Sequence, residues 1–234
     1  MKLDASESLV ITYEDTPVPP VGDANTVLLM HFDGNVNDSS LLPNTVTNNG
    51  LTFTSGYFGS AGSFDGSSRY ASVQNAIVFN PNANWTIEFW VNSSNIGAQQ
   101  ILYESKSSTG TTPDFVCELY ASNIEFYTVK NGGDYGYGFN IPSLSLSSNT
   151  WYHIAVVKNG TNWYCFVNGV AQTLNTIVGA TTNTIEQFNS NSIHLIGMNI
   201  EMDGRGLQGM MDEFRISTTA RWTANFTPPV AAYA

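Results

Sequence analysis

Apolar and polar residues alternate in short runs along most of this chain, and such alternation is typical of β-strands. In the run TIEFWV, residues 86–91, Ile, Phe and Val share one face while Thr, Glu and Trp share the other. No segment keeps an apolar period of 3.6 residues over roughly ten positions, as an amphipathic helix would. Further runs of this kind predict strands at 27–32, 70–73, 101–105, 115–120, 124–130, 192–198 and 210–217.

Residues 151–170, WYHIAVVKNGTNWYCFVNGV, predict a β-hairpin followed directly by a second turn. Asn159-Gly160 suits a two-residue type I′ turn, because both central residues of that turn need a positive φ. The strands His153–Lys158 and Trp163–Val167 flank it, and Asn168-Gly169 turns the chain again. Alternation gives each strand a face towards a core, so we interpret the hairpin mainly as scaffold, despite its clustered aromatic residues.

Many short strands separated by frequent turns predict an all-β fold, an antiparallel two-sheet sandwich or jelly roll. A chain of 234 residues can bury a sizeable core in one such domain, which we expect over residues 26–229. Residues 1–25 are proline-rich and poor in apolar positions, and are expected to be an extension. That extension is either a tail or an anchor that pairs with another chain, and residues 230–234 are expected to be a C-terminal tail.

The charge balance excludes some partners. The net charge is −11 with only eight Lys and Arg residues, which argues against nucleic acid because phosphate binding needs clustered basic side chains. An acidic surface favours cations such as Ca²⁺, although acidity also keeps a protein with few lysines soluble. Charged residues make up only 12% of the chain, and the Asn, Ser, Thr and Gly residues that replace them suit hydrogen bonding to sugars.

The sequence also indicates the cellular compartment in which the protein is made. Cys117 and Cys165 fall in predicted strands and are expected to be free buried thiols rather than a bridge. The N-terminus lacks the apolar stretch of a secretory signal, and no apolar run approaches the roughly 20 residues that span a bilayer. We therefore expect synthesis in a cytoplasm and no membrane insertion, with release as part of a particle as one route to the outside.

A set of segments in fixed order resembles the laminin-G-like, concanavalin A-like lectin/glucanase superfamily. They are LLMHFDGNVNDSS, SAGSFDGSSRYASV, WTIEFWV, TWYHIAVVKNGTNWYCFVNGV, IHLIGM and GMMDEFRIS, over about residues 27–217. The ending ARWTANFTPP, residues 220–229, is similar to the C-terminus of such domains in tailed bacteriophages and related viral proteins. The resemblance implies a two-sheet jelly roll, and binding of glycans or cell-surface molecules more often than catalysis.

Asp33 and Asp212 are the candidate metal ligands, since one follows the first core strand and the other lies in the closing strand. In related folds a Ca²⁺ ion often ties the first strand to the last, and two carboxylates with carbonyls and water would supply its oxygen ligands. The alternative is that each carboxylate caps a turn through local hydrogen bonds. The sequence therefore predicts a structural Ca²⁺ site but leaves turn capping open.

Two predicted loops are candidate ligand-binding sites. In the loop 131–139, NGGDYGYGF, the glycines leave Asn131, Asp134, Tyr135 and Tyr137 exposed for stacking on sugar rings and hydrogen bonding to hydroxyls. In the loop 198–207, MNIEMDGRGL, the candidates are Asp203 and Arg205, although Arg205 can equally pair with a neighbouring acid.

No catalytic carboxylate arrangement is visible. Glycan hydrolases of this superfamily carry E-x-D-x-x-E on one strand, and the chain has no such triplet. Asp212 and Glu213 are adjacent, so a regular strand would point them to opposite faces. We therefore expect no enzyme activity.

The function that the sequence favours is adhesion, by a non-catalytic module of a viral or phage appendage that recognises a host-surface glycan. We expect other virion proteins as partners through the N-terminal extension, and the virion as the location. The alternatives are a structural protein that decorates or cements a virion without binding sugar, and a divergent glycan hydrolase.

Overall fold

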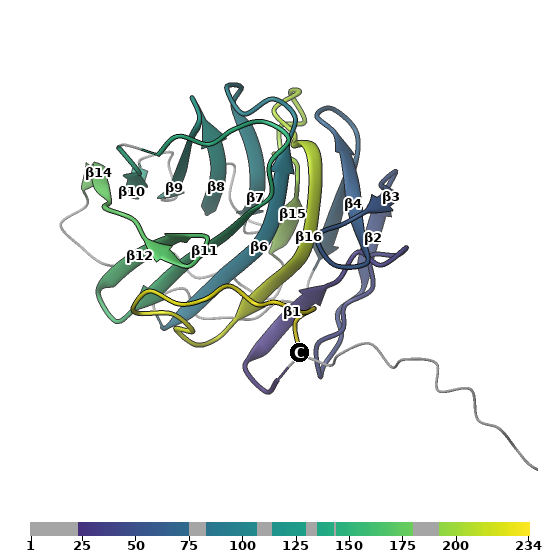
Figure 1. Cartoon of the computed structure of the whole chain (residues 1–234), viewed down its shortest axis with the longest axis horizontal. Coiled ribbons are helices and arrows are strands. Elements are labelled where there is room, and N and C mark those ends of the chain that lie inside the picture. Colours follow the sequence, from purple (N-terminus) through teal and green to yellow (C-terminus); the bar gives the residue numbers. More distant parts are fainter. Residues whose placement is uncertain (1–22, 75–82, 107–113, 130–134, 143, 180–191) are drawn as a thin grey trace, which may run out of the picture.

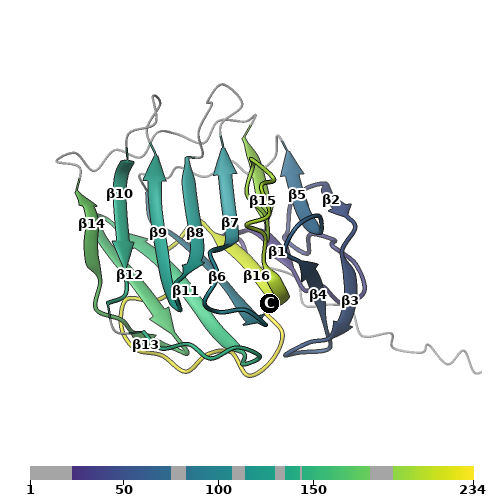
Figure 2. The same cartoon turned by 90° about the horizontal axis from the view of Figure 1, so that it is seen from above.

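The computed structural model describes residues 23–74, 83–106, 114–129, 135–142, 144–179 and 192–234, and every regular element in these ranges is a β-strand. The strands form two antiparallel sheets of eight strands each, packed face to face (Figures 1 and 2). The predicted all-β jelly-roll sandwich is confirmed. The described residues include no helix long and apolar enough to cross a membrane.

The first sheet, called sheet A, contains the hairpin predicted from the sequence. Its strands in spatial order are β13 (Val170–Ala171), β12 (Asn162–Val167), β11 (Tyr152–Asn159), β6 (Trp85–Ser93), β16 (Gln208–Ser217), β4 (Ser60–Asp65) and β3 (Thr52–Ser55). Strand β1 (Thr26–Met30) also pairs with β16, so the first and last strands are neighbours.

The second sheet, called sheet B, faces the viewer in Figure 2. Its strands in order are β14 (Asn175–Gly179), β10 (Tyr135–Asn140), β9 (Asn123–Val129), β8 (Phe115–Tyr120), β7 (Gln100–Lys106), β15 (Ile193–Ile196), β5 (Tyr70–Gln74) and β2 (Val46–Asn49). Strand β10 corrects one expectation, because it occupies most of the predicted loop 131–139. Its backbone pairs with β9 on one side and β14 on the other, which the glycines of YGYGF do not prevent.

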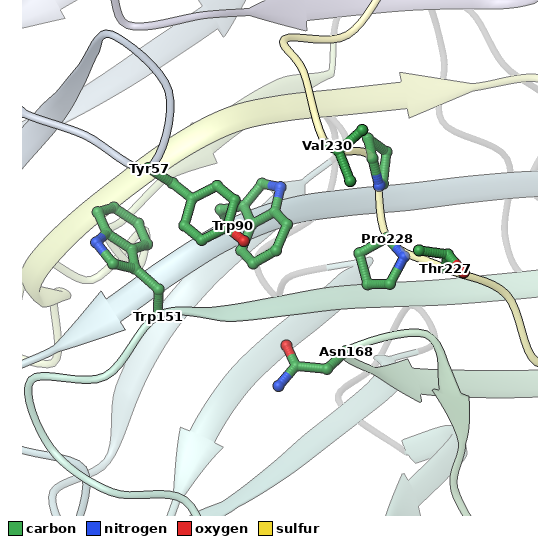
Figure 3. Close-up of a pocket in the computed structure, with 8 residues that line it drawn as sticks. Tyr57, Trp90, Trp151, Asn168, Thr227, Pro228 and Val230 are labelled. Atoms are coloured by element: carbon green, nitrogen blue, oxygen red, sulfur yellow. The ribbon is translucent and has the colours of Figure 1, made fainter.

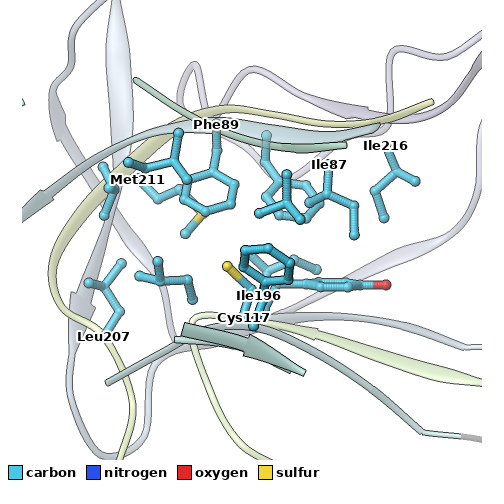
Figure 4. Close-up of a cluster of buried hydrophobic side chains, with 14 of the residues drawn as sticks. Ile87, Phe89, Cys117, Ile196, Leu207, Met211 and Ile216 are labelled. Carbon is cyan, nitrogen blue, oxygen red and sulfur yellow. The ribbon is translucent and has the colours of Figure 1, made fainter. Parts of the chain in front are cut away.

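The hydrophobic core lies between the two sheets. Figure 4 shows Phe89 of β6 and Met211 of β16 facing Cys117 and Ile196 of sheet B. All four side chains are fully buried, and burying each large apolar side chain contributes about 1.5–3 kcal/mol. Cys117 and Cys165 are both free and buried, as expected.

The outer face of sheet A is covered as well, by residues 218–234, here called the C-terminal segment. Figure 1 shows this yellow segment crossing the outside of the sheet towards β12 and returning to β1. Phe226 stacks on Trp222, with ring centroids 3.8 Å apart, and both pack on Ala155, Val157 and Phe166. Residues 230–234, which were expected to be a tail, therefore contribute a buried side chain to the fold, since Tyr233 is only 2% exposed.

A buried carboxylate joins the C-terminal segment to sheet A. Glu88 is fully buried and accepts hydrogen bonds from Arg215 Nε at 3.0 Å and Nη2 at 2.8 Å. Trp222 Nε1 donates to the second oxygen of Glu88 at 2.8 Å, and His153 Nε2 lies 3.4 Å from that oxygen. Tyr233 completes the layer, with its hydroxyl 2.8 Å from the same His153 nitrogen. These charge-assisted bonds compensate the burial of the carboxylate.

A β-bulge overturns the prediction for the adjacent carboxylates of β16. The pairing of β16 with β6 shifts between Asp212 and Arg215, and Glu213 has a φ of 51°. The bulge directs both Asp212 and Glu213 to the outer side of sheet A, instead of to opposite faces. Glu213 there contacts His31 Nδ1 at 2.8 Å and accepts the backbone N–H of Tyr233 at 2.7 Å.

Replacing Glu88 with Gln tests whether this buried carboxylate holds the C-terminal segment. We expect the free energy of unfolding to fall by about 3 kcal/mol, because Arg215 is left buried without its counter-charge. Urea denaturation measures the loss. Glu201→Gln is the matched control, since the side chain of Glu201 is 46% exposed and its ion pair with Arg205 is worth less than about 1 kcal/mol. Equal losses in the two variants would contradict the role given to Glu88.

Candidate functional site

A pocket of about 320 Å³ opens on the outer face of sheet A, beside the C-terminal segment. Segments far apart in the sequence meet there, namely the turn 56–60, strand β6, the start of β11, the turn after β12 and the C-terminal segment. Its lining residues are Tyr57, Trp90, Trp151, Asn168, Thr227, Pro228, Pro229 and Val230. Figure 3 shows Tyr57 and Trp151 on one side of this space, and Thr227, Pro228 and Val230 on the other.

Aromatic rings form one wall of the pocket. Tyr57 stacks on Trp90 with ring centroids 3.5 Å apart and planes 13° from parallel, while Trp151 meets Tyr57 edge to face at 6.1 Å. Trp90 is only 4% exposed, whereas Tyr57 remains 43% exposed. The stack thus offers a rigid, partly exposed aromatic surface, which is a common feature of binding sites.

Two carboxylates fix the turn that carries Tyr57. Asp212 Oδ2 accepts the backbone N–H groups of Tyr57 and Phe58, both at 2.9 Å, and Asp33 Oδ1 accepts that of Ser60 at 2.7 Å. Glycine is favoured beside them, because Gly59 has a φ of 49° and a Cβ there, 2.3 Å from Asp33 Oδ1, would displace the carboxylate. The two predicted metal ligands therefore meet at one turn and cap it from distant parts of the chain, and not through the local hydrogen bonds that the sequence left open as an alternative.

The turn after β12 brings the opposite wall into place. Asn168 and Gly169 have φ values of 49° and 76°, as in a type I′ turn. Gly169 O accepts the backbone N–H of Phe226 at 2.9 Å, and a Cβ on Gly169 would lie 1.9 Å from the carbonyl oxygen of Phe226. The absence of a side chain at 169 thus lets residues 227–230 approach Asn168.

Two buried polar atoms beneath the pocket have no hydrogen-bond partner in the described part of the chain. They are the Nε1 of Trp90 and the Oδ1 of Asp212, and the two residues pair across β6 and β16. Burial, together with the neighbouring charge of Glu213, raises the pKa of Asp212 from 3.8 to about 7.

Of the predicted ligand-binding residues, Asp203 and Arg205 lie away from this pocket. Arg205 Nε donates to both carboxylate oxygens of Asp203, at 3.0 and 2.9 Å, in a loop whose Arg205 carbonyl accepts the N–H of Ile101 in sheet B. Neither residue lines the pocket. Asn131 and Asp134 lie outside the described residues, and Tyr135 and Tyr137 belong to β10 rather than to a loop. A binding role for these residues stays a prediction.

The pocket residues themselves were missed from the sequence, although two signals pointed to them. Trp151 is the first residue of the predicted hairpin segment 151–170, and Asn168 is in its second turn. Both were assigned to scaffold because alternation alone does not reveal what covers the outer face of a sheet.

Calcium binding also stays a prediction. Among the residues that the structure describes, no group of three or more His, Cys, Asp or Glu side chains could hold a metal ion. The oxygens of Asp33 and Asp212 that bond to the turn 56–60 are occupied by backbone N–H groups.

The comparisons with known proteins agree with this architecture. The model of the concanavalin A-like lectin/glucanases superfamily matches residues 65–225, which is more than half of the chain. The chain belongs to this superfamily. No curated protein matches the sequence significantly.

Solved structures share the fold of this concanavalin A-like domain at low sequence identity. The binding domain of Paraclostridial Mosquitocidal Protein 1 is 19% identical with a TM-score of 0.64, and covers 84% of this chain and 49% of its own. The binding domain of botulinum neurotoxin serotype G is 15% identical with a TM-score of 0.61, covering 84% and 48%. This chain thus spans about half the length of each toxin domain.

A third structure matches over nearly its whole length. Domain 4 of AbnA, a GH43 extracellular arabinanase from Geobacillus stearothermophilus in complex with arabinotriose, is 15% identical with a TM-score of 0.59. The match covers 84% of this chain and 93% of that domain. At these identities the likeness establishes the fold of the concanavalin A-like domain.

The raised pKa of Asp212 predicts a pH-dependent stability. The folded protein holds the Asp212 proton up to about pH 7, whereas the unfolded chain releases it near pH 3.8. The contribution of Asp212 to the free energy of unfolding is therefore lost as the pH rises from 3.8 to about 7. Asp212→Asn keeps an acceptor for the turn and carries no charge. Its unfolding free energy relative to the parent should therefore rise by about 3 kcal/mol from acidic to alkaline pH.

Urea denaturation of the two proteins at about pH 4.5 and pH 8 measures this difference. Comparing variant with parent cancels other groups, such as His194, whose pKa burial lowers from 6.5 to about 3 and whose effect has the opposite sign. A relative stability that stays constant across the window would show that Asp212 is ionised normally.

The melting temperature, measured with added Ca²⁺ and with a chelator, tests the predicted calcium site. If Asp33 and Asp212 hold a Ca²⁺ ion, the ion binds only the folded state, so the melting temperature rises with Ca²⁺ and falls on chelation. Asp33→Asn should abolish the difference. A melting temperature that is the same under both conditions would rule the site out.

Proposed function

We propose that this domain is a non-catalytic module that binds a carbohydrate on a cell surface, and that its binding site is the aromatic pocket. The observation that carries the proposal is the exposed stack of Tyr57 on Trp90, with Trp151 at its edge and the amide of Asn168 nearby. Aromatic rings pack on the C–H faces of sugar rings, and an amide fixes orientation through hydrogen bonds to polar substituents. A volume of about 320 Å³ accommodates one sugar unit.

The similar structures support a binding role. The two toxin structures are titled as binding domains, and the arabinanase domain is described in complex with arabinotriose. A shared fold gives only an analogy for function, so the residues of the pocket carry the specific argument.

The carboxylates nearest to the pocket support the absence of catalysis. Glycoside hydrolysis needs one carboxyl group to protonate the leaving oxygen and another to act as nucleophile or base at the sugar. Asp212 and Glu213 share the outer face of sheet A, but they are 0% and 1% exposed. Asp212 holds the turn 56–60 and Glu213 bonds to His31 and Tyr233, so neither reaches a sugar in the pocket.

The proposal extends to a viral or phage protein, and this part of it rests only on the sequence of residues 220–229. In that setting the domain is part of a virion appendage that attaches to a host glycan. Residues 1–25 then contact other virion proteins. The competing function is a decoration protein that stabilises a particle and binds no sugar.

Truncating the aromatic wall tests the site. On a glycan array, and then by calorimetry with a glycan that binds, Trp151→Ala and Tyr57→Ala should each lower affinity at least about tenfold, because central aromatic side chains dominate binding energy. Tyr120→Ala is the matched control, since Tyr120 is similarly exposed, at 47%, but lies at the end of β8 in sheet B. Thermal melting confirms that each variant is folded.

The same assay tests the loop site predicted from the sequence. Arg205→Ala should leave affinity unchanged if the pocket is the site. Loss of binding in Arg205→Ala with full binding in Trp151→Ala would transfer the site to the loop 198–207. A protein that binds no glycan but assembles stably into particles would favour the decoration function.

A further inference from the structure

The two walls of the pocket differ in chemistry, and the difference bears on the class of sugar. One wall is aromatic, and the opposite wall consists of Pro228, Pro229 and Val230, with Thr227 at its end (Figure 3). Val230 is 86% exposed, which is the largest apolar exposure beside the pocket. A sugar ring stacked on the aromatic wall turns a substituent towards these residues. A bare hydroxyl group placed there would lose water without gaining a partner, whereas a methyl group would gain contact.

One polar side chain of the pocket offers a donor that has no partner among the described residues. Asn168 lines the pocket and is exposed, and its Oδ1 already accepts the backbone N–H of His153 at 2.9 Å, so the Nδ2 group is the part of this side chain left to bond a ligand. The Nε1–H of Trp90 is buried in the pocket lining without a partner in the described residues. Because that atom is too buried to contact a ligand, the preference for a ligand group that accepts hydrogen bonds rests on Asn168 Nδ2. A carbonyl oxygen accepts a hydrogen bond without bringing a further donor that needs its own acceptor.

The absence of charged residues from the pocket lining further limits the class of sugar that fits. None of the lining residues is charged, and the chain as a whole carries a net charge of −11. Sugars with a carboxylate or sulfate group would meet this negative field without a basic side chain in the lining. A free amino sugar would place a charged ammonium group against the Pro–Val wall, at a cost in desolvation.

We propose that the pocket selects a neutral sugar bearing an acetamido group, an N-acetylated hexosamine unit of a surface glycan. The acetyl methyl group packs on Pro228 and Val230, and the acetamido carbonyl oxygen accepts from Asn168 Nδ2. The sugar ring stacks on the wall formed by Tyr57 and Trp151. This inference rests on the proposed function and names its substrate class.

Matched pairs of methyl glycosides test the selection, namely N-acetylglucosamine against glucose and N-acetylgalactosamine against galactose. Calorimetry or ligand-observed NMR should give at least about tenfold tighter binding for one N-acetylated sugar than for its parent. The methyl resonance of the acetamido group should receive the largest saturation transfer from the protein.

Two variants assign that preference to the predicted contacts. Asn168→Asp keeps the Oδ1 acceptor for the His153 N–H and tolerates the positive φ of 49° at this position, but replaces the amide donor by a carboxylate. Val230→Ser changes a side chain that is 86% exposed, so folding should be unaffected, and removes the methyl contact. We expect Asn168→Asp to abolish the N-acetyl preference, and Val230→Ser to reduce it severalfold.

The outcomes separate this inference from the proposed function. Equal binding of acetylated and parent sugars, lost in Trp151→Ala, would overturn the acetamido selection and keep the pocket as a sugar site. An N-acetyl preference that persists in both Asn168→Asp and Val230→Ser would also overturn it, because the acetamido group would then lie elsewhere. Binding of none of the four sugars, nor of any larger glycan, would overturn the proposed function itself.

Discussion

The outer face of sheet A depends on one buried negative charge, that of Glu88. A carboxylate in a protein interior is strongly unfavourable unless charged and polar partners surround it, and Arg215, Trp222 and His153 supply these here. Since Trp222 belongs to the C-terminal segment, satisfying the charge also fixes that segment on the sheet. The walls of the pocket at 227–230 lie in the same segment, so the site exists only because the segment stays in place.

Much of the fold was predictable because strand alternation is a local property. The faces of residues 86–91 and of the hairpin 152–167 follow directly from alternation, and the structure agrees with both. Strands β2 and β3 were not predicted because Thr, Asn and Ser dominate them, and β13 because its two residues are too few to show a period. Strand β14 was not predicted either. Strand β10 was taken for a loop because its glycines outweighed the alternation of its aromatic residues.

The candidate site was much less predictable, because it forms where distant segments meet. Sequence reasoning selected Asp33 and Asp212 and raised turn capping for each, but it could not show that the two cap the same turn from opposite ends. The bulge at Glu213 reverses the side on which a carboxylate emerges, and no local pattern announces it. Trp90 and Asn168 become neighbours of Pro228 only once the last residues have crossed the sheet.

Two hydrogen bonds that anchor the C-terminal segment determine which part of the pocket can vary in sequence. Phe226 is bonded to Gly169 on one side of residues 227–230, and Tyr233 is bonded to Glu213 on the other. The residues between these anchors contribute a wall of the pocket while the sandwich core is built by other parts of the chain. The pocket wall at 227–230 and the sandwich core are therefore encoded in separate stretches of sequence. Mutation, natural or in a library, can vary the first with little penalty to the second, as in an antibody loop on its framework.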